Sequence, residues 1–406
     1  MTQKPMEREE PKLLRRDWIV LPLLAVATML FVAIAAETIA GKVFTKSKTV
    51  LGSCLTSMHG DTGGQGIPKC VTYEKDYDTP LVQYKFDACG FRSDLGCDQH
   101  KPGDYRIVML GSSVAFGQWV PQDATIADRL PIDIKEKTNR TVELYNEAMM
   151  QEFPQFSDMR LKEAVKSKPD MILWVVSAYD VSMAPLTTKF VTQVAAATGK
   201  SHLAWWTTYL KLLLANNSVL SVANTLEQHT VERLRSTATG TALQNVLYAG
   251  RDRYVRAYLG RPDSEAGYLS LSSSKAWEAD YQSFAHYAAD MASVSKAAKV
   301  PFVVTLVPTR AQAAMLSSGV WPSGYDPNKL DYETRSIILR DGGQFADIFP
   351  YLRHVPNLEK HFYMNGHPDA QGHIILSRAI AAELTNGTIP TLTTVVNDSQ
   401  IPEYGK

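Results

Sequence analysis

Apolar residues in this chain come in short runs separated by longer amphipathic segments from residue 106 onward. Five runs have the length of buried strands, at residues 106–110, 142–146, 171–176, 302–307 and, more weakly, 344–348. Helical periodicity fills the segments between them, as at residues 156–166 and 284–299. Alternating strands and helices predict right-handed crossovers and a mainly parallel sheet. We therefore expect an α/β fold with three layers, α/β/α, around a five-stranded sheet.

One connection between the expected strands is far longer than a single crossover needs. It runs from residue 176 to residue 302. We interpret residues 185–280 as a helical insertion, which forms either a lid or substrate wall or a packing elaboration away from any site. Its aromatic residues fit stacking on sugars or burial in a helical core. These are Trp205, Trp206 and Tyr209.

The longest apolar run lies near the N-terminus. Residues 18–36 carry no charge and are long enough to cross a bilayer as a helix. Arg15 and Arg16 come directly before this run, which predicts a cytoplasmic N-terminus and a main domain outside the cytoplasm, periplasmic or extracellular. A cleaved signal peptide is the alternative, because residues 33–35 resemble a cleavage site. The length of the run favours a retained single-pass anchor.

These patterns divide the chain into five parts. They are a cytoplasmic leader (1–17), a transmembrane helix (18–40), a cysteine-containing, loop-rich collar (41–100), the α/β domain (101–385) and a flexible tail (386–406).

Charge and cysteine usage narrow the functional classes. Lysine plus arginine and aspartate plus glutamate number 42 each, so no net charge argues for a nucleic-acid partner. All four cysteines, Cys54, Cys70, Cys89 and Cys97, lie in the collar, which predicts two disulfides in an oxidising compartment. Three pairings are possible, of which sequential pairing closes the shortest loops; four free thiols are the alternative. The sequence contains no Cys-x-x-Cys spacing, so we do not expect these cysteines to bind zinc.

Two hydroxyl side chains follow the first expected strand. The apolar run stops at Gly111, Ser112 and Ser113 follow, and a helical pattern begins. Ligands bind at the carboxyl ends of strands in parallel α/β sheets, where a serine can be held exposed. Ser113 is therefore the candidate nucleophile; alternatively, the two serines only end a strand.

A histidine lies in a loop rich in glycine and proline just before the last expected helix, at residues 373–384. This loop and the one at Ser113 reach the same edge of such a sheet, so His367 can approach Ser113. A serine hydroxyl needs a base, and neutral imidazole is the usual one. His367 is the candidate base, whereas we expect His373 to form structural hydrogen bonds.

The two blocks together resemble the SGNH (GDSL-like) hydrolases. Gly90-Phe91-Arg92 and Arg106-Ile107 look like the lead-in of the family's membrane-anchored envelope members, and Asp347 with Pro350 looks like their last-strand segment. Gly111-Ser112-Ser113 is similar to the Gly-Asp-Ser of the family's first block. The stretch from Asn365 to Asp369 is similar to its last block, which carries an Asp before the histidine. The resemblance covers about residues 85–385 apart from the insertion, and it implies an SGNH or flavodoxin-like sheet.

The resemblance also implies roles for individual residues. Asn365 stands where the family has the Asp that orients the histidine; its carbonyl can accept a hydrogen bond but cannot stabilise an imidazolium by charge. The backbone N–H groups of Ser113 and Gln151 would form the oxyanion hole, and the hydroxyl of Tyr179 would replace the family's Asn donor.

The implied function is a membrane-anchored serine esterase or O-acyltransferase. Its substrate would be an acyl ester, chiefly acetyl, of an extracytoplasmic glycan, and a membrane acyltransferase would be a possible partner. No metal, diffusible cofactor or nucleic acid is expected. The alternative is a degenerate SGNH-fold subunit that binds carbohydrate or serves assembly without catalysis, because the Asp and Asn of the family are both substituted.

Overall fold

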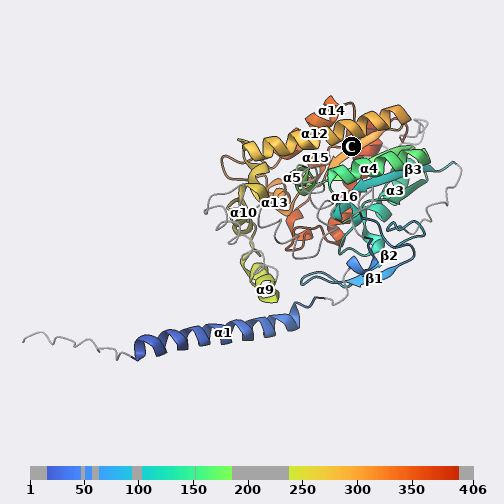
Figure 1. Ribbon diagram of the computed structural model, residues 1–406. Helices are drawn as coiled ribbons and strands as arrows, with labels where there is room; N and C mark the ends of the chain where they lie inside the picture. The colour runs from blue at the N-terminus through green and yellow to red at the C-terminus, as the bar shows by residue number, and fades with distance from the viewer. Residues whose placement is uncertain are drawn as a thin grey trace, which may run out of the picture.

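The computed structural model describes residues 16–46, 51–56, 64–93, 103–150, 152–184 and 237–392. It shows an α/β domain and a long helix, α1 (Asp17–Val43), which contacts the domain near its C-terminal end (Figure 1). Several sequence-predicted positions lie outside the described residues. They are Cys97, Gln151, Trp205, Trp206 and Tyr209.

A parallel five-stranded sheet forms the centre of the domain, in the order β4-β3-β5-β6-β7. Its strands are β3 (Tyr105–Gly111), β4 (Val142–Asn146), β5 (Met171–Val176), β6 (Phe302–Leu306) and β7 (Gln344–Phe345). This is the doubly wound order typical of flavodoxin-like sheets. The structure thus confirms the predicted fold class. Only β7 is clearly shorter than predicted, as a short edge strand next to β6.

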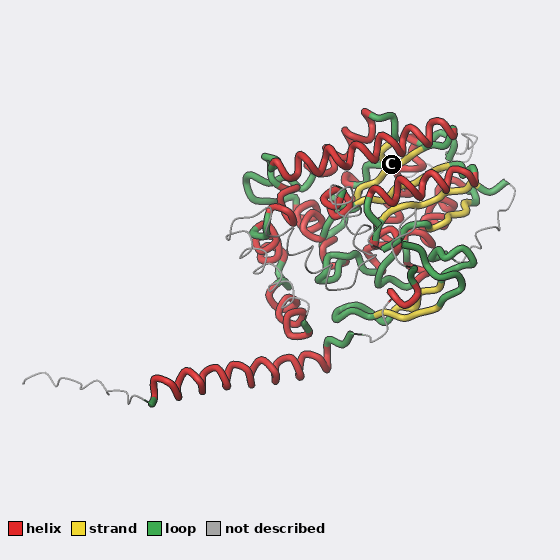
Figure 2. Tube along the Cα trace, in the orientation of Figure 1, coloured by secondary structure: helices red, strands yellow, loops and turns green. Residues whose placement is uncertain are grey.

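Helices cover both faces of the sheet (Figure 2). One face carries α3 (Ile126–Thr138) and α16 (Ala370–Glu383); the other carries α4 (Pro154–Ala164), α12 (Lys275–Ala298) and α14 (Lys329–Arg340). All residues of β5 and β6 are buried, as expected for strands covered on both faces. Trp174 of β5 stacks on Phe284 of α12, with ring centroids 5.0 Å apart. Aromatic packing therefore joins the sheet to α12, the longest helix of this domain among the described residues.

Shorter helices connect these elements. They are α2 (Ser113–Phe116), α5 (Ala178–Met183), α9 (Ala238–Leu247), α10 (Arg251–Leu259), α11 (Asp263–Ala266), α13 (Arg310–Ser318) and α15 (Phe349–Leu352). Single 3-10 turns are η1 (Leu51–Cys54), η2 (Gln122–Ala124), η3 (Val165–Ser167), η4 (Gly267–Leu269) and η5 (Leu358–His361), and a π-helical turn is η6 (Leu384–Thr388).

The collar contains regular structure that the sequence did not indicate. Strand β1 (Val71–Glu74) pairs antiparallel with β2 (Val82–Lys85), and both are too short to give a clear alternation. Cys54 and Cys70 form a disulfide, one of the two pairs expected from sequential pairing. Cys89 is disulfide-bonded as well.

Arg92 attaches the collar to the α/β domain. Its side chain is fully buried and lies over the ring of Tyr84, 4.6 Å from the ring centroid. The guanidinium donates hydrogen bonds to three backbone carbonyls at the end of α2 and in the segment after it. These belong to Phe116 (3.1 Å), Gly117 and Val120 (2.6 Å). A collar residue therefore holds the segment that follows Ser113.

The C-terminal segment packs against the domain up to residue 392, beyond the predicted end of the domain at residue 385. Ile389 and Leu392 are buried in the core, and the hydroxyls of Tyr105 and Thr391 are 3.0 Å apart. The expectation of a flexible tail from residue 386 is therefore wrong for residues 386–392. Two isolated apolar residues give no periodic pattern from which this packing could be predicted.

Helix α1 has the length and composition of a membrane span. Residues Trp18–Val43 include an 18-residue window of mean hydropathy 2.7, none of which is buried against the rest of the chain. This agrees with the predicted apolar helix, although the same properties also occur in signal sequences. The orientation of the chain in a membrane remains a prediction.

We expect Arg92→Leu to lower the free energy of unfolding by about 3 kcal/mol or more, because buried carbonyls lose their charged donor. Denaturant unfolding of the detergent-solubilised chain, followed by circular dichroism, measures this. Arg335→Leu is the matched control, because Arg335 is half exposed and forms an ion pair with Asp347 at 3.0 Å. Its loss should cost less than about 1 kcal/mol. Equal effects of the two substitutions would contradict the attachment role of Arg92.

Candidate active site

The position of Ser113 depends on the glycine that ends β3. Gly111 has φ +142°, and a Cβ atom there would lie 2.3 Å from the carbonyl oxygen of Val175 and 2.8 Å from the Cβ of Ala115. Only glycine allows β3 to approach β5 this closely and turn directly into α2. Ser112 is buried by this turn, whereas Ser113 remains partly exposed. The candidate nucleophile thus lies where the strand order reverses, the usual ligand position in this class of sheet.

Ser112 and Asp180 connect the carboxyl ends of the neighbouring strands β3 and β5. Asp180 accepts hydrogen bonds from the backbone N–H (2.7 Å) and the hydroxyl (2.6 Å) of Ser177, and from the side chain of Ser112. Burial raises the pKa of Asp180 to about 6, although these hydrogen bonds oppose the shift. Asp180 therefore has a structural role next to the nucleophile.

His367 reaches Ser113 from a tight loop between η5 and α16. The backbone N–H of Gly366 donates to the carbonyl of Tyr363 (3.0 Å), and the N–H of Tyr363 donates to the carbonyl of His367 (2.9 Å). These bonds present the imidazole so that its Nε2 lies 2.8 Å from Ser113 Oγ, across 254 positions of sequence. The structure thus brings the two sequence-predicted residues into hydrogen-bonding contact.

Asn365 determines which ring nitrogen of His367 carries the proton. The backbone N–H of His367 donates to Asn365 Oδ1 (3.0 Å), so the amide oxygen faces the histidine. The same oxygen lies 3.3 Å from Nδ1 of the ring. An oxygen can only accept there, so Nδ1 holds the proton and Nε2 is free to accept from Ser113. Asn365 therefore favours the tautomer that a serine nucleophile requires.

The surroundings of His367 keep its ring neutral. Desolvation lowers its pKa to about 4, and the negative charge of Asp76, in the loop between β1 and β2, opposes this. The ring meets Trp119 edge-on, with centroids 4.7 Å apart. Trp119 has a left-handed backbone (φ 60°), and its N–H donates to the hydroxyl of Tyr84 in the collar (2.7 Å).

Two further residues hold the histidine loop and were not identified in the sequence. Asp78 of the collar accepts a hydrogen bond from the backbone N–H of Met364 (2.7 Å), directly before Asn365. Arg310, at the start of α13, contacts the sulfur of Met364 (2.9 Å). Asp78 is 286 residues from Met364 in an irregular region, and no local pattern marks it.

The expected oxyanion donors are only partly defined. The backbone N–H of Ser113, at the first position of α2, has no acceptor among the described residues. It is available to an oxyanion. Gln151 lies outside the described residues. Tyr179 is 44% exposed, and within the described part of the chain its hydroxyl contacts neither Ser113 nor another hydrogen-bonding group.

His373 takes no part in this arrangement. Its Nδ1 accepts a hydrogen bond from the backbone N–H of Ile126 (3.3 Å), and burial lowers its pKa to about 3. It joins the start of α16 to the start of α3. The described residues contain no group of three or more His, Cys, Asp or Glu side chains that could hold a metal ion.

No family model matches the chain, and no curated protein matches it either. Two solved structures that it resembles are TesA and the lipase Lip_vut3 from a goat rumen metagenome. The first is 8% identical, with a TM-score of 0.35, over 69% of this chain and 98% of TesA. The second is 11% identical, with a TM-score of 0.33, over 69% of this chain and 97% of the lipase. At this level the likenesses carry no argument about activity.

We expect His367 to titrate near pH 4 rather than near 6.5, because its ring is desolvated. Asp76→Asn should lower the pKa of His367 further, since it removes the charge that favours the imidazolium. Nuclear magnetic resonance of histidine-labelled protein measures both values, with His367→Gln to assign the signal. A midpoint near 6.5, or no effect of Asp76→Asn, would contradict this account of the site.

Proposed function

We propose that the chain is a serine esterase whose nucleophile is Ser113 and whose general base is His367. The observation that carries the proposal is the 2.8 Å contact between Ser113 Oγ and a ring nitrogen that Asn365 leaves unprotonated. A serine hydroxyl hydrogen-bonded to a neutral, oriented imidazole is the arrangement that activates it for acyl transfer. The low pKa of His367 means that the ring is in its base form at neutral pH.

The reaction proceeds through an acyl-enzyme. Ser113 Oγ attacks the ester carbonyl while its proton moves to His367 Nε2, and the backbone N–H of Ser113 donates to the oxyanion. Collapse of the tetrahedral intermediate breaks the bond to the alcohol, which takes the proton from His367 as it leaves. Water, or the hydroxyl of an acceptor, then attacks the acyl-serine while its proton moves to His367. The bond from the acyl carbon to Ser113 Oγ breaks, and Oγ takes the proton back from His367. Hydrolysis and acyl transfer therefore share every step but the identity of the final nucleophile.

Asn365 orients the imidazole of His367 but lacks the negative charge of an aspartate. In a trypsin-like triad, replacing the Asp by Asn costs about 10⁴ in kcat because the histidine takes the wrong tautomer. Here the backbone N–H of His367 holds the amide oxygen towards the ring, which avoids that error. What remains lost is the stabilisation of the imidazolium, for which Asp76 compensates in part. We infer a functional but slow base.

For the substrate we propose an acyl ester, chiefly acetyl, of a glycan outside the cytoplasm. Two features support this choice. The segments at Gly90-Phe91-Arg92 and Arg106-Ile107 resemble the lead-in of envelope members of the SGNH hydrolases, and α1 is suited to anchor the domain at a membrane. Release of acetate from an acetylated polysaccharide, with and without an added glycan acceptor, separates hydrolysis from transfer.

Ser113→Ala should lower kcat/KM for an aryl acetate by about a thousandfold or more, because the nucleophile is lost. Ser283→Ala, on an exposed turn of α12, is the matched control and should leave the rate unchanged. Equal activity in the Ser113→Ala variant and the parent would eliminate the esterase proposal and leave a non-catalytic binding or assembly role.

Asn365→Asp should raise kcat/KM at neutral pH by roughly tenfold or more, since a carboxylate stabilises the imidazolium. It should also move the acid limb of the pH profile. Activity requires neutral His367, so the parent loses activity as the pH falls through about 4. The new charge raises the pKa of His367, and the limb of the variant moves to higher pH. An unchanged acid limb would show that Asn365 does not act on His367.

A further inference from the structure

The outward face of α9 is apolar. The helix contains no charged residue, and its exposed positions, Leu243, Val246 and Leu247, follow the spacing of one helix face. Their exposed fractions are 55%, 72% and 38%. Single apolar residues are ordinary on a protein surface, but an apolar stripe on an uncharged surface helix indicates a surface that is covered by something other than water.

α9 begins at the apolar helix α1. The carboxylate of Glu37 accepts hydrogen bonds from the backbone N–H groups of Ala238 and Thr239, each at 3.0 Å. Figure 1 shows α9 between α1 and the rest of the domain, running across the axis of α1 rather than along it. A helix that crosses a membrane-spanning helix in this way lies along the membrane surface.

The position of Glu37 in α1 indicates the depth of α9 relative to the bilayer that α1 would span. The uncharged residues 18–36 span about 28 Å at 1.5 Å per residue, close to the hydrocarbon thickness of roughly 30 Å. Glu37 follows directly and therefore falls at the boundary between hydrocarbon and headgroups. The first residues of α9 lie at the same level because they bind its carboxylate.

We propose that α9 is an interfacial helix that lies in the headgroup boundary of the bilayer that α1 spans, with Leu243, Val246 and Leu247 in contact with lipid. Helices of this kind bury their apolar face about 5–10 Å into the boundary. The occupant of this face is lipid rather than a protein partner, because the face continues directly from a helix whose own apolar side chains are unburied.

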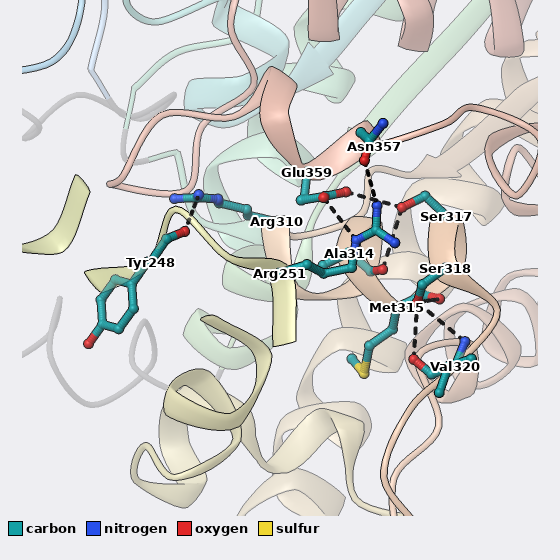
Figure 3. A network of polar contacts seen from close by, with 10 residues as sticks. All are labelled: Tyr248, Arg251, Arg310, Ala314, Met315, Ser317, Ser318, Val320, Asn357 and Glu359. Atoms are coloured by element: carbon teal, nitrogen blue, oxygen red, sulfur yellow. Dashed lines mark hydrogen bonds and ion pairs between the residues drawn. The ribbon is translucent and has the colours of Figure 1, made fainter. Parts of the chain in front are cut away.

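The residues that follow α9 form polar contacts with α13 and with the segment at Asn357 and Glu359 (Figure 3). Tyr248 follows α9 directly, and its carbonyl accepts from Arg310 (3.5 Å). Arg251 donates to Glu359 (2.9 Å) and to Asn357 (2.8 Å). Arg310 also contacts Met364 in the histidine loop. These contacts connect α9 to the loop that carries His367.

Site-directed labelling of the full chain in nanodiscs tests the proposal. An environment-sensitive fluorophore is attached to Val246→Cys, with Leu30→Cys in α1 as the position expected inside the bilayer and Leu339→Cys as an exposed control on α14. The described native cysteines are all disulfide-bonded, and the unsubstituted chain serves as the labelling blank. Quenching is measured with lipids that carry a doxyl group either near the headgroup or near the end of the acyl chain.

We expect the fluorescence at Val246→Cys to be lost chiefly with the shallow quencher, at Leu30→Cys chiefly with the deep one, and at Leu339→Cys with neither. Quenching at Leu30→Cys without quenching at Val246→Cys overturns the proposal while keeping the anchor. Absence of quenching at both positions overturns it together with its membrane premise. A buried signal at Val246→Cys that lipids do not quench means that protein covers the face, which also overturns it.

A second variant separates contact from folding. Leu243→Glu places a charge on the same face at an already exposed position. In the Val246→Cys background it should abolish shallow quenching and leave the circular dichroism spectrum unchanged. Retention of shallow quenching in this variant would contradict the assignment of the lipid-facing side of α9.

Discussion

The site depends on how closely two neighbouring strands approach where β3 ends. Gly111 places its backbone against the carbonyl of Val175 at a distance that leaves no room for a side chain. The strand therefore ends abruptly, and the next residues start a helix instead of continuing past the sheet. Ser113 lies partly exposed at the carboxyl end of β3 only because this turn is possible. Ser112 and Asp180 then hold the two strand ends together beside it. One steric constraint thus determines where the proposed nucleophile lies.

The proposed base, His367, is positioned by a different kind of interaction. A loop before α16 brings His367 to Ser113, and the loop is held from outside by Asp78 and Arg310 through the backbone and side chain of Met364. Asn365 acts from within the same loop. Its effect depends on which way its amide points, and that is decided by the backbone N–H of His367. The residue type alone suggested a defect; its hydrogen bonds show an oriented acceptor that lacks charge.

This contrast shows what the sequence could predict. The strands of the central sheet were predictable because buried parallel strands are continuous apolar runs, and the Ser113 and His367 loops followed from their positions at strand and helix ends. The hairpin of β1 and β2, the buried Arg92 and the charge of Asp76 were not. Their roles arise from contacts between segments far apart in the chain, in a region without periodicity. Gln151 stays a prediction, whereas the tail was mispredicted because two apolar residues form no pattern.

Arg92 of the collar donates to backbone carbonyls at and after the end of α2. The part of the chain that is needed to keep the site intact is therefore larger than the sheet and its helices. A fragment starting at β3 would contain every strand of the sheet, Ser113 and His367. It would lack the donor that holds the Trp119 segment and both acidic side chains that act on the histidine loop. The α/β sheet therefore begins at β3, whereas the residues that maintain the proposed site begin earlier, in the collar. Replacing the collar would therefore also change the environment of His367.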